Sequence, residues 1–411
     1  MLKQIPEWRK KVKLKEVYNI SSWLWKWRKY FWKWYPFLSY KTVFNNFFVP
    51  DKLEDLVEST SEEQDKYSIK RWDVFITRTS EVINEIGMTC VALKDYPTAT
   101  FNWFTKRLRP KVDYILPEYI AYFFRSKYFR NQISNVCSII TRASLNNEIL
   151  KNLEILLPPL PIQQKIASIL SKYDDLIENN NKRIKILEQM AQAIYNEMIG
   201  KKSEKFLKKS EEGKELPEGW RVEKVENFVN FIRWIEPWSK NYKDKQEEGD
   251  IPFIRVKDLN SGNVSTFISR ELAKDKIAYL EDVLVSFDWT IGIVKRGLYG
   301  CFSSWIRKLK WKTDLITNEF LYLLFKSDLI QKIIKAHAKW TTILHAGGSI
   351  KFMKFVLPPE NILKKFNHLV KPILDQILNL QLQNQNLKQA RDLLIPRLVT
   401  GKLNVEDLEI V

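Results

Sequence analysis

The chain has 411 residues, and its 67 Lys and Arg against 49 Asp and Glu give a formal net charge of +18. This length allows two or three domains, each with a core of its own. The positive charge favours a polyanionic partner such as nucleic acid, because each neutralised phosphate releases counterions; a basic solvated surface is the equal alternative.

Cysteine usage, histidine spacing and hydropathy exclude several other classes of protein. The three cysteines are far apart and odd in number, which predicts a reducing compartment without disulfides. Neither they nor the three histidines have the spacing of metal ligands, so we expect no bound metal. The sequence has no run of 18 apolar residues and no signal-like N-terminus, which predicts a cytoplasmic protein without membrane contact.

We expect residues 1–157 to form a first globular domain of mixed α/β type. Within it, residues 22–40 (SWLWKWRKYFWKWYPFLSY) alternate Trp with Lys and Arg. This pattern is typical of an interfacial membrane segment or of a platform that stacks single-stranded bases. If several of these Trp are Gly, the stretch is instead a flexible basic loop. Its cations are candidates for phosphate contact, with solvated side chains as the alternative: Lys26, Arg28, Lys29 and Lys33.

Tryptophan is more frequent than glycine, with 15 Trp and 12 Gly. Average usage would give roughly 29 Gly in a chain of this length. Several Trp stand where a turn is expected, among them Trp72, Trp103, Trp289, Trp305 and Trp340. We hypothesise that many of these codons are UGA, which the source organism decodes as Gly. Further candidates are Trp23, Trp25, Trp27, Trp32, Trp34, Trp234 and Trp238, whereas Trp8, Trp220 and Trp311 have the character of genuine Trp.

A long helix is predicted at 158–200, directly after Leu157-Pro158-Pro159. From Ile162 to Met198 the apolar residues recur every three or four positions, which gives a helix about 55 Å long at ~1.5 Å per residue. The charged segment at 201–215 (KKSEKFLKKSEEGKE) has few apolar residues and is expected to be a solvated linker.

The second half of the chain repeats the first. A second domain is expected at 216–357, where Leu357-Pro358-Pro359 repeats the earlier motif, and a second helix with a C-terminal tail at 358–411. If the helices pack antiparallel as a coiled coil, the two domains are related by a pseudo-twofold axis and span about 15 base pairs of duplex. Asn180 and Asn384 interrupt the apolar seam and either fix the register or are solvated.

These features resemble the specificity subunits of Type I restriction-modification enzymes. The resemblance rests on LPPLPIQQKI at 157–166 and on LIPRLVTGKL at 394–403. It implies two target recognition domains, each of which reads one half of a bipartite double-stranded DNA sequence. It also implies that the helices set the spacing and bind two methyltransferase subunits. Those partners would carry S-adenosylmethionine, and a motor-nuclease subunit, where present, would use ATP and Mg; no cofactor is expected on this chain.

Base recognition needs polar side chains that loops deliver into a groove, although Ser and Thr in turns often bond the backbone instead. In the first domain the candidates are Arg78, Thr79, Ser80, Thr141, Arg142 and Ser144. In the second domain they are Asp288, Thr290, Lys295, Arg296, Thr341, Thr342 and His345, with Arg255 and Lys257 as candidates for phosphate contact.

The sequence has no Gly-rich nucleotide loop and no base-methylation motif, so we expect no catalytic residue in this chain. Two alternatives stay open. A stand-alone nuclease would need clustered carboxylates such as Asp174 and Asp175, and would cleave DNA with a divalent metal. A helical scaffold without a DNA target would bind DNA only weakly and without dependence on salt.

Overall fold

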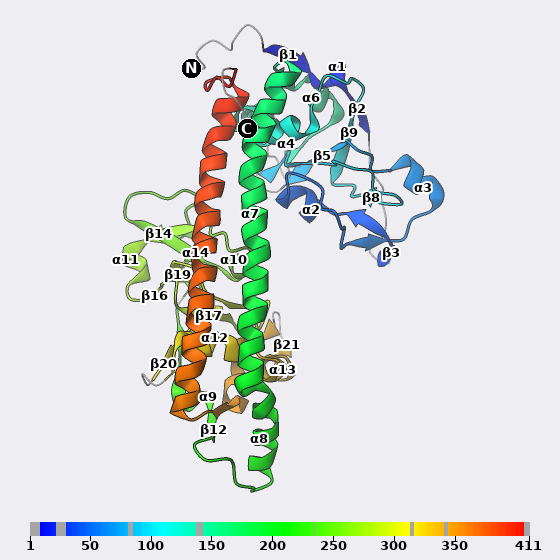
Figure 1. Ribbon diagram of the computed structural model, residues 1–411. Coiled ribbons are helices and arrows are strands. Elements are labelled where there is room, and N and C mark those ends of the chain that lie inside the picture. The colour runs from blue at the N-terminus through cyan, green and yellow to red at the C-terminus, as the bar shows by residue number, and fades with distance from the viewer. Residues whose placement is uncertain are drawn as a thin grey trace. The chain divides into compact units, whose positions relative to one another are not determined.

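The computed structural model describes residues 9–21, 30–80, 85–136, 143–234, 236–312, 316–340 and 344–406. The chain divides into two compact units. The first combines residues 1–177 with 386–411, and the second comprises 178–385. Each unit contains one globular domain and one end of each of two long helices (Figure 1).

The first domain is built around a four-stranded antiparallel sheet in the order β2-β9-β5-β7. Its central strand β5 is buried at all four positions and apolar at the first three, as expected of a strand covered on both faces. Strand β1 pairs with β11, so the first and last strands of the domain lie side by side. The strands are β1 (Lys10–Lys13), β2 (Tyr18–Ser21), β3 (Phe31–Leu38), β4 (Leu56–Val57), β5 (Val74–Thr77), β6 (Thr79–Ser80), β7 (Thr89–Val91), β8 (Thr100–Phe101), β9 (Thr105–Pro110), β10 (Ala143–Ser144) and β11 (Glu154–Leu157).

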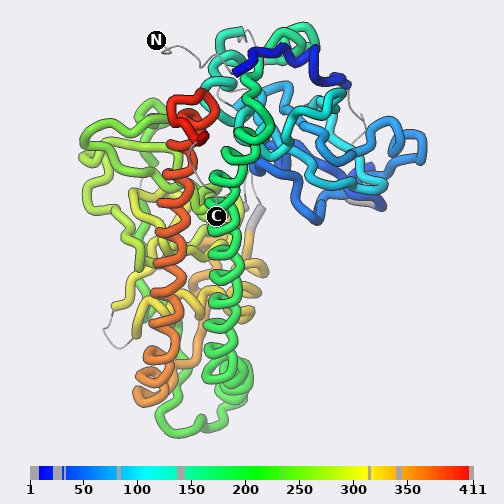
Figure 2. Tube along the Cα trace, turned by 45° about the horizontal axis from the view of Figure 1, so that its top comes forward, coloured from blue at the N-terminus to red at the C-terminus, as the bar shows by residue number. Residues whose placement is uncertain are grey.

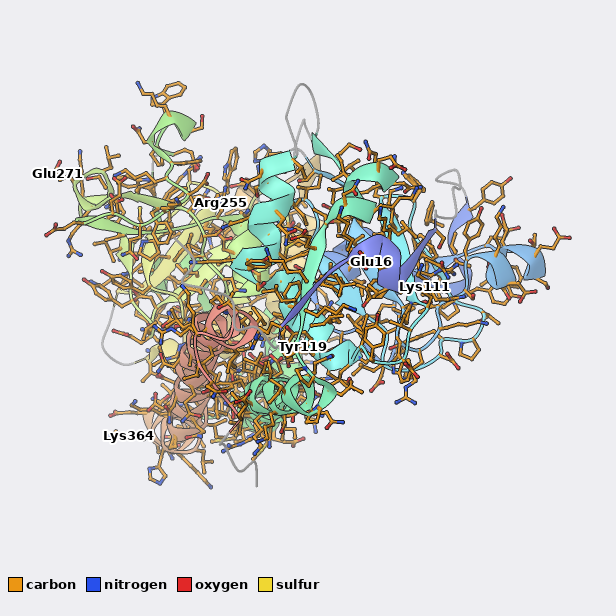
Figure 3. All side chains as sticks on the ribbon, turned by 90° about the horizontal axis from the view of Figure 1, so that it is seen from above. Glu16, Lys111, Tyr119, Arg255, Glu271 and Lys364 are labelled. Carbon is orange, nitrogen blue, oxygen red and sulfur yellow. The ribbon has the colours of Figure 1, made fainter. Side chains whose placement is uncertain are left out.

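Two consecutive helices, α4 (Pro117–Arg125) and α5 (Lys127–Val136), supply much of the first core. Pro117 suits the first turn of α4, where its missing N–H has no helical partner. Tyr119, labelled in Figure 3, donates a hydrogen bond of 2.7 Å from its hydroxyl to the Leu156 carbonyl of β11. The remaining short helices are α1 (Leu14–Val17), α2 (Tyr40–Asn45), α3 (Ser61–Lys66) and α6 (Asn147–Asn152).

The second domain repeats this plan. Its antiparallel sheet has the order β13-β20-β17-β18, and its first and last strands, β12 and β23, also pair. The strands are β12 (Arg221–Lys224), β13 (Val229–Arg233), β14 (Asp250–Ile254), β15 (Phe267–Ser269), β16 (Ile277–Ala278), β17 (Val283–Ser286), β18 (Val294–Lys295), β19 (Gly300–Phe302), β20 (Ile306–Trp311), β21 (Lys339–Trp340), β22 (Leu344–His345) and β23 (Lys354–Leu357). The helices are α9 (Val225–Phe228), η4 (Ser239–Asn241), α10 (Val256–Ser261), α11 (Arg270–Ala273), α12 (Asn318–Lys326), α13 (Asp328–Ala336) and η5 (Gly347–Phe352). The internal duplication is therefore confirmed.

Helices α7 (Leu160–Tyr195) and α14 (Glu360–Val399) run side by side in opposite directions (Figures 1 and 2). In the first unit, Lys165 bonds the Glu406 carbonyl at 2.5 Å, and Asp174 pairs with Arg391. In the second unit, the Asn180 amide donates to Asn384 Oδ1 at 3.0 Å, and the Asn384 amide donates to Asn181 at 2.9 Å. The antiparallel pair is thus confirmed, and Asn180 and Asn384 satisfy each other in its seam.

The structure differs from the expected linker at 201–215. A single π-helical turn, η3 (Asn196–Gly200), joins α7 to a further helix, α8 (Lys201–Glu211). Phe206 is buried, and its ring centroid lies 5.1 Å from that of Trp220. Glu204 also pairs with Lys332 at 3.9 Å, so contacts with the second domain order a segment whose composition resembles a solvated linker.

Several tryptophans have a backbone conformation that favours glycine. Of the described residues other than Gly, five have positive φ, and three of these five are Trp34 (72°), Trp72 (76°) and Trp289 (64°). All three are among the positions for which the sequence suggested Gly. Trp72 is the third residue of a turn closed by a 3.1 Å bond from Asp73 N–H to the Lys70 carbonyl. A positive φ at this position requires Gly in a type II turn.

We expect Trp72→Gly to raise the free energy of unfolding by about 1 kcal/mol, because the left-handed region costs a residue with a Cβ about 1–2 kcal/mol. The matched control is Trp311→Gly. Trp311 is buried, its ring packs on Phe320, and its Nε1 donates to the Thr317 carbonyl at 2.9 Å, so its loss should cost about 3–5 kcal/mol. Urea unfolding of both variants measures the difference, and a destabilised Trp72→Gly chain would contradict the glycine hypothesis.

Candidate nucleic-acid interface

In the first domain, two groups of predicted site residues meet in a two-stranded ribbon. Strand β6 pairs antiparallel with β10, with Thr79 opposite Ser144. Leu145 N–H donates to the Arg78 carbonyl at 2.8 Å, and Arg78 N–H donates to the Phe104 carbonyl at 2.8 Å. We call residues 78–80 and 144–145 the first ribbon. Thr79 is half-buried, Ser80 is buried, and Ser144 is exposed at its surface.

The second domain has an equivalent ribbon. A single bridge joins Asp288 to His345, Ala346 N–H donates to the Phe287 carbonyl at 2.7 Å, and Phe287 N–H donates to the Trp305 carbonyl at 3.2 Å. Each of these three connections has a counterpart in the first ribbon, which has one further pair, Ala143 with Ser80. We call residues 287–288 and 345–346 the second ribbon. The predicted residues Asp288 and His345 are thereby brought together from positions far apart in the sequence.

The two ribbons carry different chemistry at matching positions. The first presents the hydroxyls of Thr79 and Ser144, with Arg78 and Lys106 nearby; burial, and then the Arg78 charge, lower the pKa of Lys106. The second presents a charged cluster. Asp288 Oδ1 lies 2.5 Å from His345 Nδ1, and Asp288 Oδ2 lies 3.7 Å from Arg307 Nη2.

Lys295 and Arg296 lie away from the second ribbon, in the packing of the domain against the helices. Arg296 is buried, with Nη2 at 3.1 Å from Glu319 Oε1. Lys295 lines a small recess with Glu188 and Tyr322, and burial lowers its pKa, with Glu188 raising it in part. Arg296 is buried and Lys295 is half-buried against the helices, so neither cation belongs to the surface of the second ribbon.

The other described candidates are accessible. Arg255, labelled in Figure 3, precedes α10 with its Nε at 3.8 Å from Asp258 Oδ2, and Lys257 is exposed in the first turn of that helix. Thr290 is exposed, and its carbonyl accepts a 2.5 Å bond from the Ser286 hydroxyl. The remaining candidates lie outside the described residues, as does the side chain of Lys33: Lys26, Arg28, Lys29, Thr141, Arg142, Thr341 and Thr342.

A largely buried polar cluster in the first unit was not predicted from the sequence. Asp174 of α7 accepts a 2.6 Å bond from the Tyr122 hydroxyl and pairs with Arg391 of α14, whose guanidinium carbon lies 4.6 Å from the centre of the Phe47 ring. In the second unit, Tyr322 donates a 3.3 Å bond to Glu188 of α7. Each domain thus reaches α7 through one tyrosine. The signal in the sequence was a tyrosine in each of the two corresponding helices α4 and α12, at neighbouring rather than identical positions of the repeat, with Arg391 inside an apolar seam.

Within the described ranges, no group of three or more His, Cys, Asp or Glu is placed to hold a metal ion. The two carboxylates considered for a nuclease, Asp174 and Asp175, do not form a joint site. Asp174 accepts the Tyr122 hydrogen bond, while Asp175 is exposed. Among the helices that the structure describes, none is long and apolar enough to cross a membrane.

Comparison with known proteins agrees with this duplicated plan. Residues 6–189 and 217–390 each match the Type I restriction modification DNA specificity domain. The Type I restriction enzyme MjaIX specificity subunit of Methanocaldococcus jannaschii is 32% identical over 337 residues, which are 77% of this chain and 76% of that protein. The HindI specificity subunit of Haemophilus influenzae is 22% identical, over 89% of this chain and 94% of its own length.

Among solved structures, the S subunit of a Type I restriction-modification system from M. genitalium aligns over 95% of this chain and 96% of its own, with 13% identity and a TM-score of 0.49. The two domain matches and the relative from M. jannaschii confirm the resemblance seen in the sequence. The chain belongs to the family of Type I restriction-modification specificity subunits, and its role is DNA sequence specificity.

Proposed function

We propose that this chain reads a bipartite double-stranded DNA target, with the first ribbon on one half and the second ribbon on the other. The observation that carries the proposal is the pair of ribbons, which share their backbone connections and differ in their side chains. A reader of two different half-sites needs this combination, because base identity is read by side chains on a common support. Arg255 and Lys257 are proposed to contact phosphate.

The helices are proposed to set the spacing of the half-sites and to dock two methyltransferase subunits. Support comes from the large apolar side chains that α7 and α14 leave exposed, since such residues are enriched at protein interfaces. They include Ile186, Met190, Leu382 and Leu393. The bound partners would supply S-adenosylmethionine and the methylation of adenine, and a motor-nuclease subunit, where present, would supply ATP- and Mg-dependent cleavage. This chain would work in the cytoplasm and contribute no catalytic group.

The test is co-expression with the methyltransferase subunit of the same system, followed by mapping of methylated adenines in host DNA. The chain is expressed both with Trp and with Gly at positions 34, 72 and 289. New methylation at a split motif is expected. If neither form assembles with the methyltransferase or adds methylation, the proposal is overturned. Metal-dependent cleavage by the chain alone would instead support the nuclease alternative, and weak, salt-insensitive DNA binding would support the scaffold.

A further inference from the structure

We propose that His345 makes a direct contact to a base edge in the half-site of the second domain, and that Asp288 is the residue that positions it. This inference rests on the proposed function and names the reading atom of the second ribbon. Its basis is the contrast in exposure between the partners: 39% of the His345 side chain is exposed, against 6% for Asp288. The imidazole therefore faces solvent, while the carboxylate lies beneath it.

The carboxylate engages one ring nitrogen, and among the described residues no hydrogen bond to the other is found. With Asp288 Oδ1 at 2.5 Å from Nδ1, the Nδ1–H donates to the carboxylate, which selects the tautomer and the ring orientation. The Nε2 atom then remains for a ligand, as an acceptor in the neutral ring and as a donor in the protonated ring. An acceptor fits the amino groups of adenine or cytosine in the major groove, and a donor fits guanine N7 or O6.

Backbone pairing and the side chain of Arg307 hold this pair in place. His345 belongs to β22, which pairs with β21, so that His345 lies opposite Lys339. The same residue bridges to Asp288, and Ala346 N–H donates to the Phe287 carbonyl. Beneath the pair, Arg307 donates to the Ser304 carbonyl at 2.6 Å and lies 3.7 Å from Asp288 Oδ2, which steadies the carboxylate. A side chain preorganised in this way loses little conformational freedom when it binds.

The first domain supports a reading role for this position. Thr79 and Ser144 occupy the places of Asp288 and His345, so the same backbone position carries a hydroxyl pair in one domain and an acid–imidazole pair in the other. If the pair only held the backbone together, the two domains would not need different side chains here. Two domains that read different half-sites do need them.

The experiment compares the methylation motif of His345→Ala, His345→Gln and Asp288→Asn chains with that of the unchanged chain, each in complex with the methyltransferase. For His345→Ala we expect discrimination at one base pair of one half-site to fall roughly tenfold, with the other half-site and the spacer unchanged. Asp288→Asn should relax the same base pair, and the double variant should be no worse than His345→Ala, because the two residues act as a unit.

Two controls separate this effect from misfolding. Ser144→Ala in the first ribbon should leave this half-site unchanged, and so should His337→Ala, which alters another half-buried histidine of the second domain. If His345→Ala leaves the motif unchanged, or slows methylation equally at all sequences as the loss of a phosphate contact would, the inference is overturned. Failure of the proposed function has a different signature, since the unchanged chain would then add no methylation at a split motif.

Discussion

Replacing Asp174 by Ala is expected to lower the free energy of unfolding by about 3 kcal/mol, the lower end of the range for a broken buried ion pair. The side chains of Asp174 and Arg391 are 25% and 11% exposed, so the variant leaves a buried guanidinium without its partner on α7. Asp392 still pairs with Arg391 at 2.9 Å, which moderates the loss. The Tyr122 hydroxyl also loses its acceptor; burial, and then the Asp174 charge, raise the pKa of Tyr122, so it stays a donor.

Urea unfolding checks this value, with Asp375→Ala as the matched control. Asp375 forms an exposed i,i+4 pair with Lys371 on α14, and its loss should cost less than about 0.5 kcal/mol. Replacing both Asp174 and Arg391 by apolar residues of similar size should recover much of the stability, because no unpaired charge then stays buried. Equal losses for Asp174→Ala and Asp375→Ala would show that the buried cluster does not hold the first domain to the helices.

DNA affinity is expected to fall by about 10³–10⁵ between roughly 50 and 200 mM salt, the drop for a protein that neutralises about 6–10 phosphates. The reason is the net charge of +18, together with exposed cations such as Lys257. Fluorescence anisotropy with the mapped target and with a scrambled duplex would measure the drop for the assembled complex. Both duplexes should give similar slopes, because phosphate contacts carry no sequence information directly.

The Lys257→Gln chain shows how much one phosphate contact contributes to the salt dependence. Loss of one phosphate contact should reduce the slope of log K against log salt by about 0.9 and weaken both duplexes alike. A slope near zero for the unchanged chain would favour the scaffold alternative over DNA recognition.

The sequence predicted the larger elements because their patterns are long and local. The apolar period between Ile162 and Met198 corresponds to α7, and the second Leu-Pro-Pro motif corresponds to the junction of β23 and α14. Helix α8 was not predicted, since contacts with distant residues, such as Phe206 on Trp220 and the ion pair of Glu204 with Lys332, order a highly charged segment. The composition of a segment does not reveal contacts of this kind, because they depend on residues elsewhere in the chain.

The candidate site was predictable only in part, for a similar reason. The sequence indicated Thr79 and Ser144, and separately Asp288 and His345, but strand pairing alone decides that each couple meets. Arg296 is the residue type expected of a DNA contact. It is nevertheless buried and paired with Glu319, which lies on a different element of the domain, α12. Polar residues in turns therefore indicate the region of the site, while burial and pairing select its members.

Exchange of one domain tests the central claim most directly. Residues 221–357 are replaced by the matching segment of another specificity subunit, both long helices are kept, and the methylated motif is mapped. We expect a new sequence in one half of the motif, with the other half and the spacer length unchanged. A motif that changes in both halves, or in neither, would contradict a chain in which each domain reads its own half-site.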